Sequence, residues 1–67
     1  MLKYEQVAKQ IEVFIKDEQL QQGDKLPILD QLTEQFEVSK TTIIKALEVL
    51  EIKGLIYQVR GSGIFVR

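Results

Sequence analysis

Hydroxyl and basic side chains gather within residues 39–45: Ser39, Lys40, Thr41, Thr42 and Lys45. Short hydroxyl side chains let a backbone approach a phosphate or a base edge, and lysine supplies positive charge. Where Ser39 caps a helix, the free N–H groups of the first turn also attract a phosphate. The major groove of DNA is about wide enough for one helix, which enters with its N-terminal residues foremost. The pattern therefore predicts a helix whose start contacts DNA.

A second candidate contact lies further along the chain. Arg60 stands beside the run Gly61-Ser62-Gly63, between two short segments rich in β-forming residues, which is typical of a β-hairpin tip. A thin tip with one arginine can enter a minor groove, where negative potential is strong when the groove is narrow. Taken alone, the pattern favours an ordinary turn with a solvated arginine. Its place one hairpin after the helix start favours a DNA contact by Arg60, Gly61 and Ser62.

Ile44 lies on the same predicted helix face as Lys40 and Lys45. An exposed isoleucine among threonines and lysines can contact the methyl group of thymine. An isoleucine at this position can equally border the hydrophobic core. The sequence leaves both interpretations open.

The other reactive side chains form no catalytic or metal-binding pattern. The chain has no cysteine and no histidine, which removes disulfides, the usual zinc ligands and Cys/His nucleophiles. Ser39 and Ser62 have no base partner, and Gly61-Ser62-Gly63 is too short for a nucleotide-binding loop. The acidic residues at helical spacing are typical of solvated faces. We therefore expect no enzymatic activity, no cofactor and no metal.

Charge is unevenly distributed along the chain. The net charge is -1, whereas nucleic-acid-binding domains are usually basic. Residues 1–39 carry four lysines against eight acids, and residues 40–67 carry five basic residues against two acids. The positive charge therefore lies in the half that carries both candidate DNA contacts. No apolar run approaches the roughly 20 residues that cross a bilayer, and the N-terminus lacks a signal-peptide pattern, so we expect a cytoplasmic protein.

Hydrophobic periodicity predicts an α+β fold that is mainly α. The expected elements are helices over residues 4–18, 28–36 and 40–53, followed by a β-hairpin with strands over 55–60 and 64–67. A chain of 67 residues forms one small domain with one core. The order of helix, helix, tight turn, helix and hairpin is that of a winged helix-turn-helix.

Capping residues signal the ends of the third predicted helix more clearly than the start of the second. Ile28 stands at the start of the second helix, where an apolar residue forgoes about 1 kcal/mol of capping. Ser39 offers a capping hydroxyl to the third helix, and Gly54 suits the left-handed cap at its end. The predicted core stripe of the third helix is Ile43, Ala46, Leu47 and Leu50.

Several short segments occur in a specific order along nearly the whole chain. They are Tyr4-Glu5-Gln6-Val7-Ala8, Gly23-Asp24-Lys25-Leu26-Pro27, Leu32-Thr33-Glu34-Gln35-Phe36, Val38-Ser39-Lys40-Thr41-Thr42, Lys45-Ala46-Leu47, Leu50-Glu51, Gly54-Leu55-Ile56 and Gly61-Ser62-Gly63-Ile64-Phe65-Val66. Each segment alone is a weak signal, but the order and spacing are highly specific. With these segments, the chain closely resembles the N-terminal domain of the GntR family of bacterial transcription regulators.

The resemblance implies the DNA-binding domain of a metabolite-responsive regulator, a repressor, that binds a roughly two-fold symmetric site in double-stranded DNA as a homodimer. It places the third helix, the recognition helix, in the major groove and the hairpin, the wing, in the minor groove. It also implies that residues 1–67 are followed, in a full-length protein, by an effector-binding and dimerising domain. The pattern looks most like the branch whose effector domain resembles a chorismate-lyase fold.

The resemblance also assigns contacts residue by residue. Lys3 and Tyr4 match N-terminal positions that can touch the DNA backbone. Residues 39–42 match the start of the recognition helix, and Lys45 continues that face. Arg60 and Gly61 match the wing tip.

The chain departs from the family pattern at the segment Ile28-Leu29-Asp30 and at Ile44. Asp30 stands where an arginine often meets DNA, and an acid there repels phosphate. Ile44 replaces a second residue that is commonly basic. The resemblance therefore implies a target that differs from the targets of arginine-bearing relatives.

A winged-helix protein–protein interaction module is the alternative function. Net acidity, Asp30 and Ile44 favour it, as do the additional apolar residues Val49 and Ile52 on the third helix. The sequence leaves this alternative open beside DNA binding.

Overall fold

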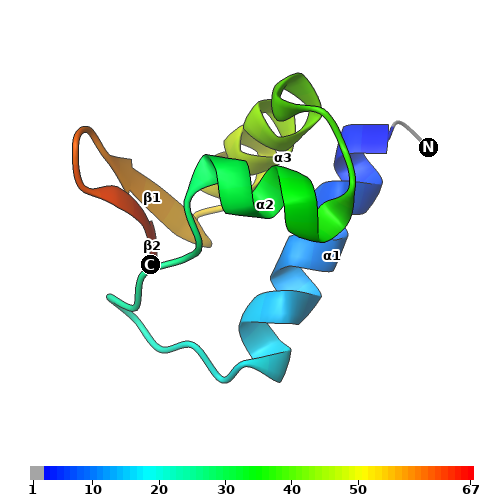
Figure 1. The fold of residues 1–67 in the computed structure, drawn as a ribbon. Helices are drawn as coiled ribbons and strands as arrows, with labels where there is room; N and C mark the ends of the chain where they lie inside the picture. The colour runs from blue at the N-terminus through cyan, green and yellow to red at the C-terminus, as the bar shows by residue number, and fades with distance from the viewer. Residues whose placement is uncertain (1–2) are drawn as a thin grey trace.

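The chain folds as three helices followed by a β-hairpin in the computed structural model, which describes residues 3–67. The elements are α1 (Lys3–Asp17), α2 (Leu29–Phe36), α3 (Lys40–Ile52), β1 (Ile56–Val59) and β2 (Gly63–Val66). Each lies within one residue of the predicted boundaries, so the α+β class and the winged helix-turn-helix are confirmed. Figure 1 shows the hairpin standing to one side of the helices, with α2 packed across α3.

The core lies around α3, which contacts α1, α2 and β1. All four residues of the predicted α3 stripe are buried: Ile43, Ala46, Leu47 and Leu50. Ile11 of α1, Leu32 of α2 and Ile56 of β1 are fully buried against this stripe. Because α3 supplies the centre of the core, the orientation of its opposite face is fixed by packing on three sides.

The start of α2 compensates for its missing cap. Ile28 occupies the N-cap position with extended backbone angles, φ −69° and ψ 165°, and its side chain makes no capping hydrogen bond. Instead, the Ile28 N–H donates to Oε1 of Gln31 at 3.2 Å. This is one half of a capping box, the arrangement in which the third helical residue reaches back to the cap. The apolar residue at position 28 is therefore tolerated.

The connection between α2 and α3 is tight because one residue adopts a left-handed conformation. Glu37 has φ 54°, and its N–H donates to the Glu34 carbonyl at 3.3 Å. The Val38 N–H then donates to the Thr33 carbonyl at 3.2 Å. At its far end, α3 is followed by Gly54 with φ 77°, the left-handed position predicted from the sequence.

The hairpin is anchored along the outer edge of β2. β1 and β2 pair antiparallel, with Ile56 opposite Val66 and Val59 opposite Gly63. The loop before α2 adds to the free edge of β2. There the Leu26 N–H donates to the Ile64 carbonyl at 2.8 Å, and the Val66 N–H donates to the Asp24 carbonyl at 2.8 Å. These bonds hold the wing in a fixed position beside the helices.

Candidate nucleic-acid interface

Ser39 and Thr42 fix the first turn of α3. Oγ of Ser39 accepts a hydrogen bond from the Thr42 N–H at 3.2 Å and lies 3.0 Å from Oγ1 of Thr42. This confirms the predicted N-cap. Thr42 is half-buried, whereas Lys40 and Thr41 are exposed. Lys40 and Thr41 are therefore the side chains that the first turn presents to a partner.

Asp30 lies beside the first residue of α3. Its Oδ1 is 3.5 Å from Nζ of Lys40, and the side chains of Lys40 and Asp30 are 61% and 76% exposed. The pair joins the first turn of α2 to the first turn of α3. The sequence marked Asp30 as a residue that repels phosphate, and the structure adds a cationic partner for it.

Tyr4 brings the start of α1 onto α3. Nζ of Lys45 lies 5.8 Å from the centre of the Tyr4 ring, within the range of a cation–π contact. Tyr4 is half-buried, and its neighbour Lys3 is exposed. The arrangement brings together two residues that the family resemblance assigned separately, and it holds the flexible lysine side chain against a ring.

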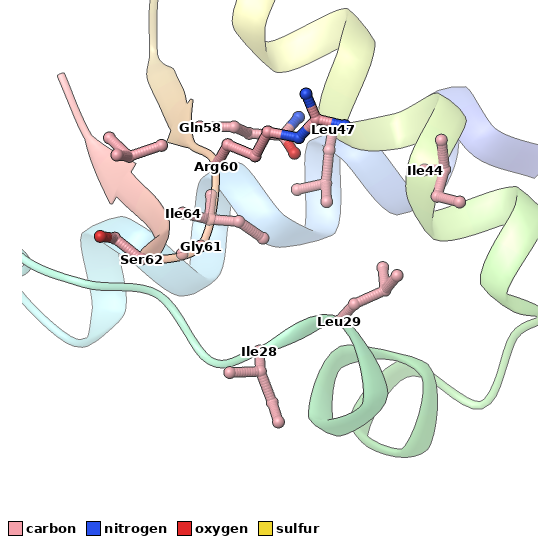
Figure 2. Close-up of a pocket in the computed structure, with 11 residues that line it drawn as sticks. Ile28, Leu29, Ile44, Leu47, Gln58, Arg60, Gly61, Ser62 and Ile64 are labelled. Atoms are coloured by element: carbon pink, nitrogen blue, oxygen red, sulfur yellow. The ribbon is translucent and has the colours of Figure 1, made fainter.

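A groove lies between the start of α2, the outer face of α3 and the turn of the wing (Figure 2). It has a volume of about 600 Å³ and is lined by Ile28, Leu29, Ile44, Leu47, Gln58, Val59, Arg60, Gly61, Ser62, Gly63 and Ile64. Among residues 3–67, five large apolar side chains are exposed, and three of these, Ile28, Ile44 and Val59, line this groove. Exposed apolar surface is therefore concentrated here, as at sites that bind a partner.

The sequence left open whether Ile44 borders the core or is exposed to a partner, and the structure shows both features. Ile44 borders the core, because it lines the groove beside the buried Leu47. It also presents surface, because 43% of the residue is exposed. An apolar group in this position can contact a partner without leaving the fold.

The wing tip lies across the groove from Ile44, as Figure 2 shows. Arg60, Gly61 and Ser62 are exposed, and the Ser62 N–H closes the turn by donating to the Val59 carbonyl at 3.0 Å. Gly61 adopts φ 81°, a left-handed conformation that a residue with a side chain rarely takes. The structure therefore brings Ile44 and the three predicted tip residues to one groove.

Other predicted residues lie outside the groove lining. They are Lys3, Tyr4, Ser39, Lys40, Thr41, Thr42 and Lys45, all at the starts of α1 and α3 or on α3 itself. The predicted site is thus two adjoining parts: the first turns of α3 with the Tyr4 contact, and the groove that leads to the wing.

Seven residues that line the groove were not among the predicted site residues: Ile28, Leu29, Leu47, Gln58, Val59, Gly63 and Ile64. Ile28 carried a signal, because an isoleucine at an N-cap position forgoes a capping bond and stays exposed. Gln58 and Val59 carried none, because strand alternation does not tell which side of a hairpin faces a helix.

No group of three or more His, Cys, Asp or Glu side chains within residues 3–67 is placed to hold a metal ion. No helix within this range is long and apolar enough to cross a membrane.

Comparison with known proteins gives three close similarities. The chain is 69% identical to the HTH-type transcriptional regulator YydK of Bacillus subtilis strain 168, over 100% of the chain and 28% of YydK. The crystal structure of YydK superimposes with a TM-score of 0.97, covering 29% of that chain. The chain is also 36% identical to the arabinose metabolism transcriptional repressor of Geobacillus stearothermophilus, over 96% of the chain and 18% of the repressor.

A second structure contains DNA. AraR(DBD) in complex with operator ORE1 superimposes with a TM-score of 0.91 at 39% identity, covering 100% of the chain and 82% of AraR(DBD). The chain spans less than a third of the length of YydK and of the arabinose repressor. The family model described as "Bacterial regulatory proteins, gntR family" matches residues 3–66. Fold, motif order and this match agree, and the chain belongs to the GntR family.

Proposed function

We propose that this chain is a sequence-specific binding domain for double-stranded DNA within a bacterial transcription regulator. The observation that carries the proposal is the groove between α3 and the wing, with Ile44 on one side and Arg60 on the other. AraR(DBD), which has the same fold at 39% identity, supports the proposal because its structure is a complex with operator DNA.

In the proposed complex, α3 lies in the major groove and the wing reaches the adjacent minor groove. A sugar–phosphate backbone separates these two grooves of DNA and then passes over the groove of the protein. The apolar lining suits deoxyribose and thymine methyl groups, which carry no charge. Arg60 at the tip suits the negative potential of a narrow minor groove.

The proposed DNA-contacting residues are those indicated by the sequence: Lys3, Tyr4, Ser39, Lys40, Thr41, Thr42, Ile44, Lys45, Arg60, Gly61 and Ser62. Within this set, Ser39 acts mainly through the backbone of the first turn, because its hydroxyl caps α3. Tyr4 acts mainly by holding Lys45. The exposed cations Lys3, Lys40, Lys45 and Arg60 supply the positive charge of this surface.

The whole regulator is proposed to be a homodimeric, metabolite-responsive repressor. A dimer would read a roughly two-fold symmetric operator, with dimerisation and effector binding in a C-terminal domain. The lengths of the relatives support this organisation, since the chain covers 28% of YydK. The arabinose metabolism transcriptional repressor, which is 36% identical to the chain, supports the proposal of repression.

A salt titration with duplex DNA tests the proposal. When Lys3, Lys40, Lys45 and Arg60 all meet phosphate, the log–log dependence of affinity on salt has a slope of about −3.5 per chain. We expect measurable binding at low salt that weakens as salt is added, with a slope no steeper than this limit. Absence of binding at low salt, for the chain and for a version joined as a dimer, would contradict DNA binding.

A protein-binding module remains the second candidate because Ile52 is 86% exposed and Val49 is half-buried beside it on α3. Chemical-shift mapping separates the two functions. Shifts confined to residues 39–45 and 60–62 on addition of DNA support the proposed function. Concentration-dependent shifts at Val49 and Ile52 without DNA support a protein interface.

A further inference from the structure

The ion pair between Asp30 and Lys40 places a negative charge at the proposed DNA-binding surface. We propose that Asp30 is a specificity-determining residue, which disfavours phosphate contacts by Lys40 and favours contacts with base edges. The inference rests on the proposed function, because it concerns how α3 distinguishes its target from other DNA.

A contribution to the stability of the fold does not explain why Asp30 and Lys40 are paired. Oδ1 of Asp30 and Nζ of Lys40 are 3.5 Å apart, and both side chains are more than half exposed. Exposed ion pairs of this kind contribute little to folding, because water screens them and two mobile side chains must be ordered. Asp30 also lies in the first turn of α2, where an acid complements the helix dipole. That local role does not require a lysine from α3 beside it.

The effect on DNA follows from the charges of the two possible partners of Lys40. A phosphate bound by Lys40 must come near the Asp30 carboxylate, and the two negative charges repel over distances shorter than the Debye length of about 10 Å. A guanine edge offers its O6 and N7 acceptors to lysine without carrying a net charge. Asp30 therefore penalises phosphate contacts, which occur on every sequence, more than base contacts, which occur only on the correct one.

Asp30→Asn tests the inference, because it removes the charge and keeps the size of the side chain. Affinity is measured against two duplexes of equal length: one selected from random DNA by the unmodified chain, and a scrambled version of it. We expect Asp30→Asn to tighten binding to the scrambled duplex several-fold and to tighten binding to the selected duplex less. On the scrambled duplex, we expect Asp30→Asn to make the log–log dependence of affinity on salt steeper by about 0.9. The affinity gained by this substitution therefore falls about threefold between roughly 50 and 200 mM salt.

Glu51→Gln is the matched control, because it makes the same change of net charge on an exposed residue at the far end of α3. Equal effects of Asp30→Asn and Glu51→Gln would overturn the inference in favour of a general charge effect. Asp30→Asn is also measured in a Lys40→Ala background, where we expect the change of slope to disappear. Persistence of the full change there would overturn the inference as well.

The design separates this inference from the proposed function. Failure of the unmodified chain to bind either duplex contradicts the proposed function itself. If the unmodified chain prefers the selected duplex and Asp30→Asn keeps this preference in full, the result contradicts only the role of Asp30. Asp30→Ser is measured in parallel, with circular dichroism of each variant, so that a loss of fold in one variant does not decide the outcome.

Discussion

Ile44 shows how a single side chain can combine a structural and a recognition role. Its position beside the buried Leu47 fixes its location, and its 43% exposure leaves part of it free to contact a partner. An isoleucine offers no hydrogen bond, so a contact with DNA must depend on apolar surface. The 5-methyl group of thymine is the apolar group that the major groove presents.

We predict that Ile44→Ala weakens binding to a selected duplex that contains thymine at the contacted position. Burial of one methyl group contributes about 0.8 kcal/mol, which corresponds to about a fourfold change in affinity. Replacing that thymine by deoxyuridine removes the methyl group, and it should weaken the unmodified chain but not Ile44→Ala. An equal loss for both proteins would show that Ile44 does not contact the methyl group.

At the scale of elements, α3 depends on its cap to present its first turn. The hydroxyl of Ser39 satisfies the Thr42 N–H, which has no partner within the helix. The cap also holds the backbone beside Lys40 and Thr41, which are exposed. Loss of the Ser39 hydroxyl therefore affects both stability and DNA affinity. A substitution that restores the cap but not DNA binding separates the two effects.

We predict that Ser39→Ala lowers the free energy of unfolding by about 1 kcal/mol and weakens DNA binding. Ser39→Asp restores a capping oxygen and adds a favourable interaction with the helix dipole, so its stability should match that of the unmodified chain. Its DNA affinity should nevertheless stay low, because the added negative charge repels phosphate. Urea unfolding and DNA titration measure the two quantities. Recovery of binding in Ser39→Asp would place Ser39 away from the phosphates.

The whole molecule has little stability to lose. A domain of 67 residues has a free energy of unfolding of about 3–10 kcal/mol. Its core centres on a single helix, and Leu50 of α3 is fully buried at that centre. The position of the wing depends on the same core, because Ile56 is buried against α3 and the loop before α2 pairs with β2.

We predict that Leu50→Ala destabilises the chain by about 2–5 kcal/mol, through lost burial and the cavity left behind. This loss is a large share of the total, so DNA binding at 37 °C should fall together with the folded fraction. Ile52→Ala is the matched control two residues away, since Ile52 is 86% exposed and should change stability little. Thermal unfolding followed by circular dichroism gives both values. A stable Leu50→Ala would indicate that the core repacks around the cavity.

Local signals in the sequence were sufficient for the elements and for part of the site. The period of Ile43, Ala46, Leu47 and Leu50 predicted the buried face of α3, and all four residues are buried. Ser39 predicted the start of the helix, and Gly54 predicted its end. These features depend on interactions within a few residues of chain, so periodicity and capping preferences are enough to reveal them.

The contacts between elements were decided only by the tertiary structure. Asp30 meets Lys40 across two helices, and Tyr4 meets Lys45 from a helix far away in the chain. The apolar groove likewise forms from α2, α3 and the wing together. Such contacts depend on how each helix is rotated and how closely it packs, which the core sets as a whole. The sequence alone determined the elements, their caps and the buried face of α3, because these depend on local interactions, and packing decided which exposed residues of different elements meet.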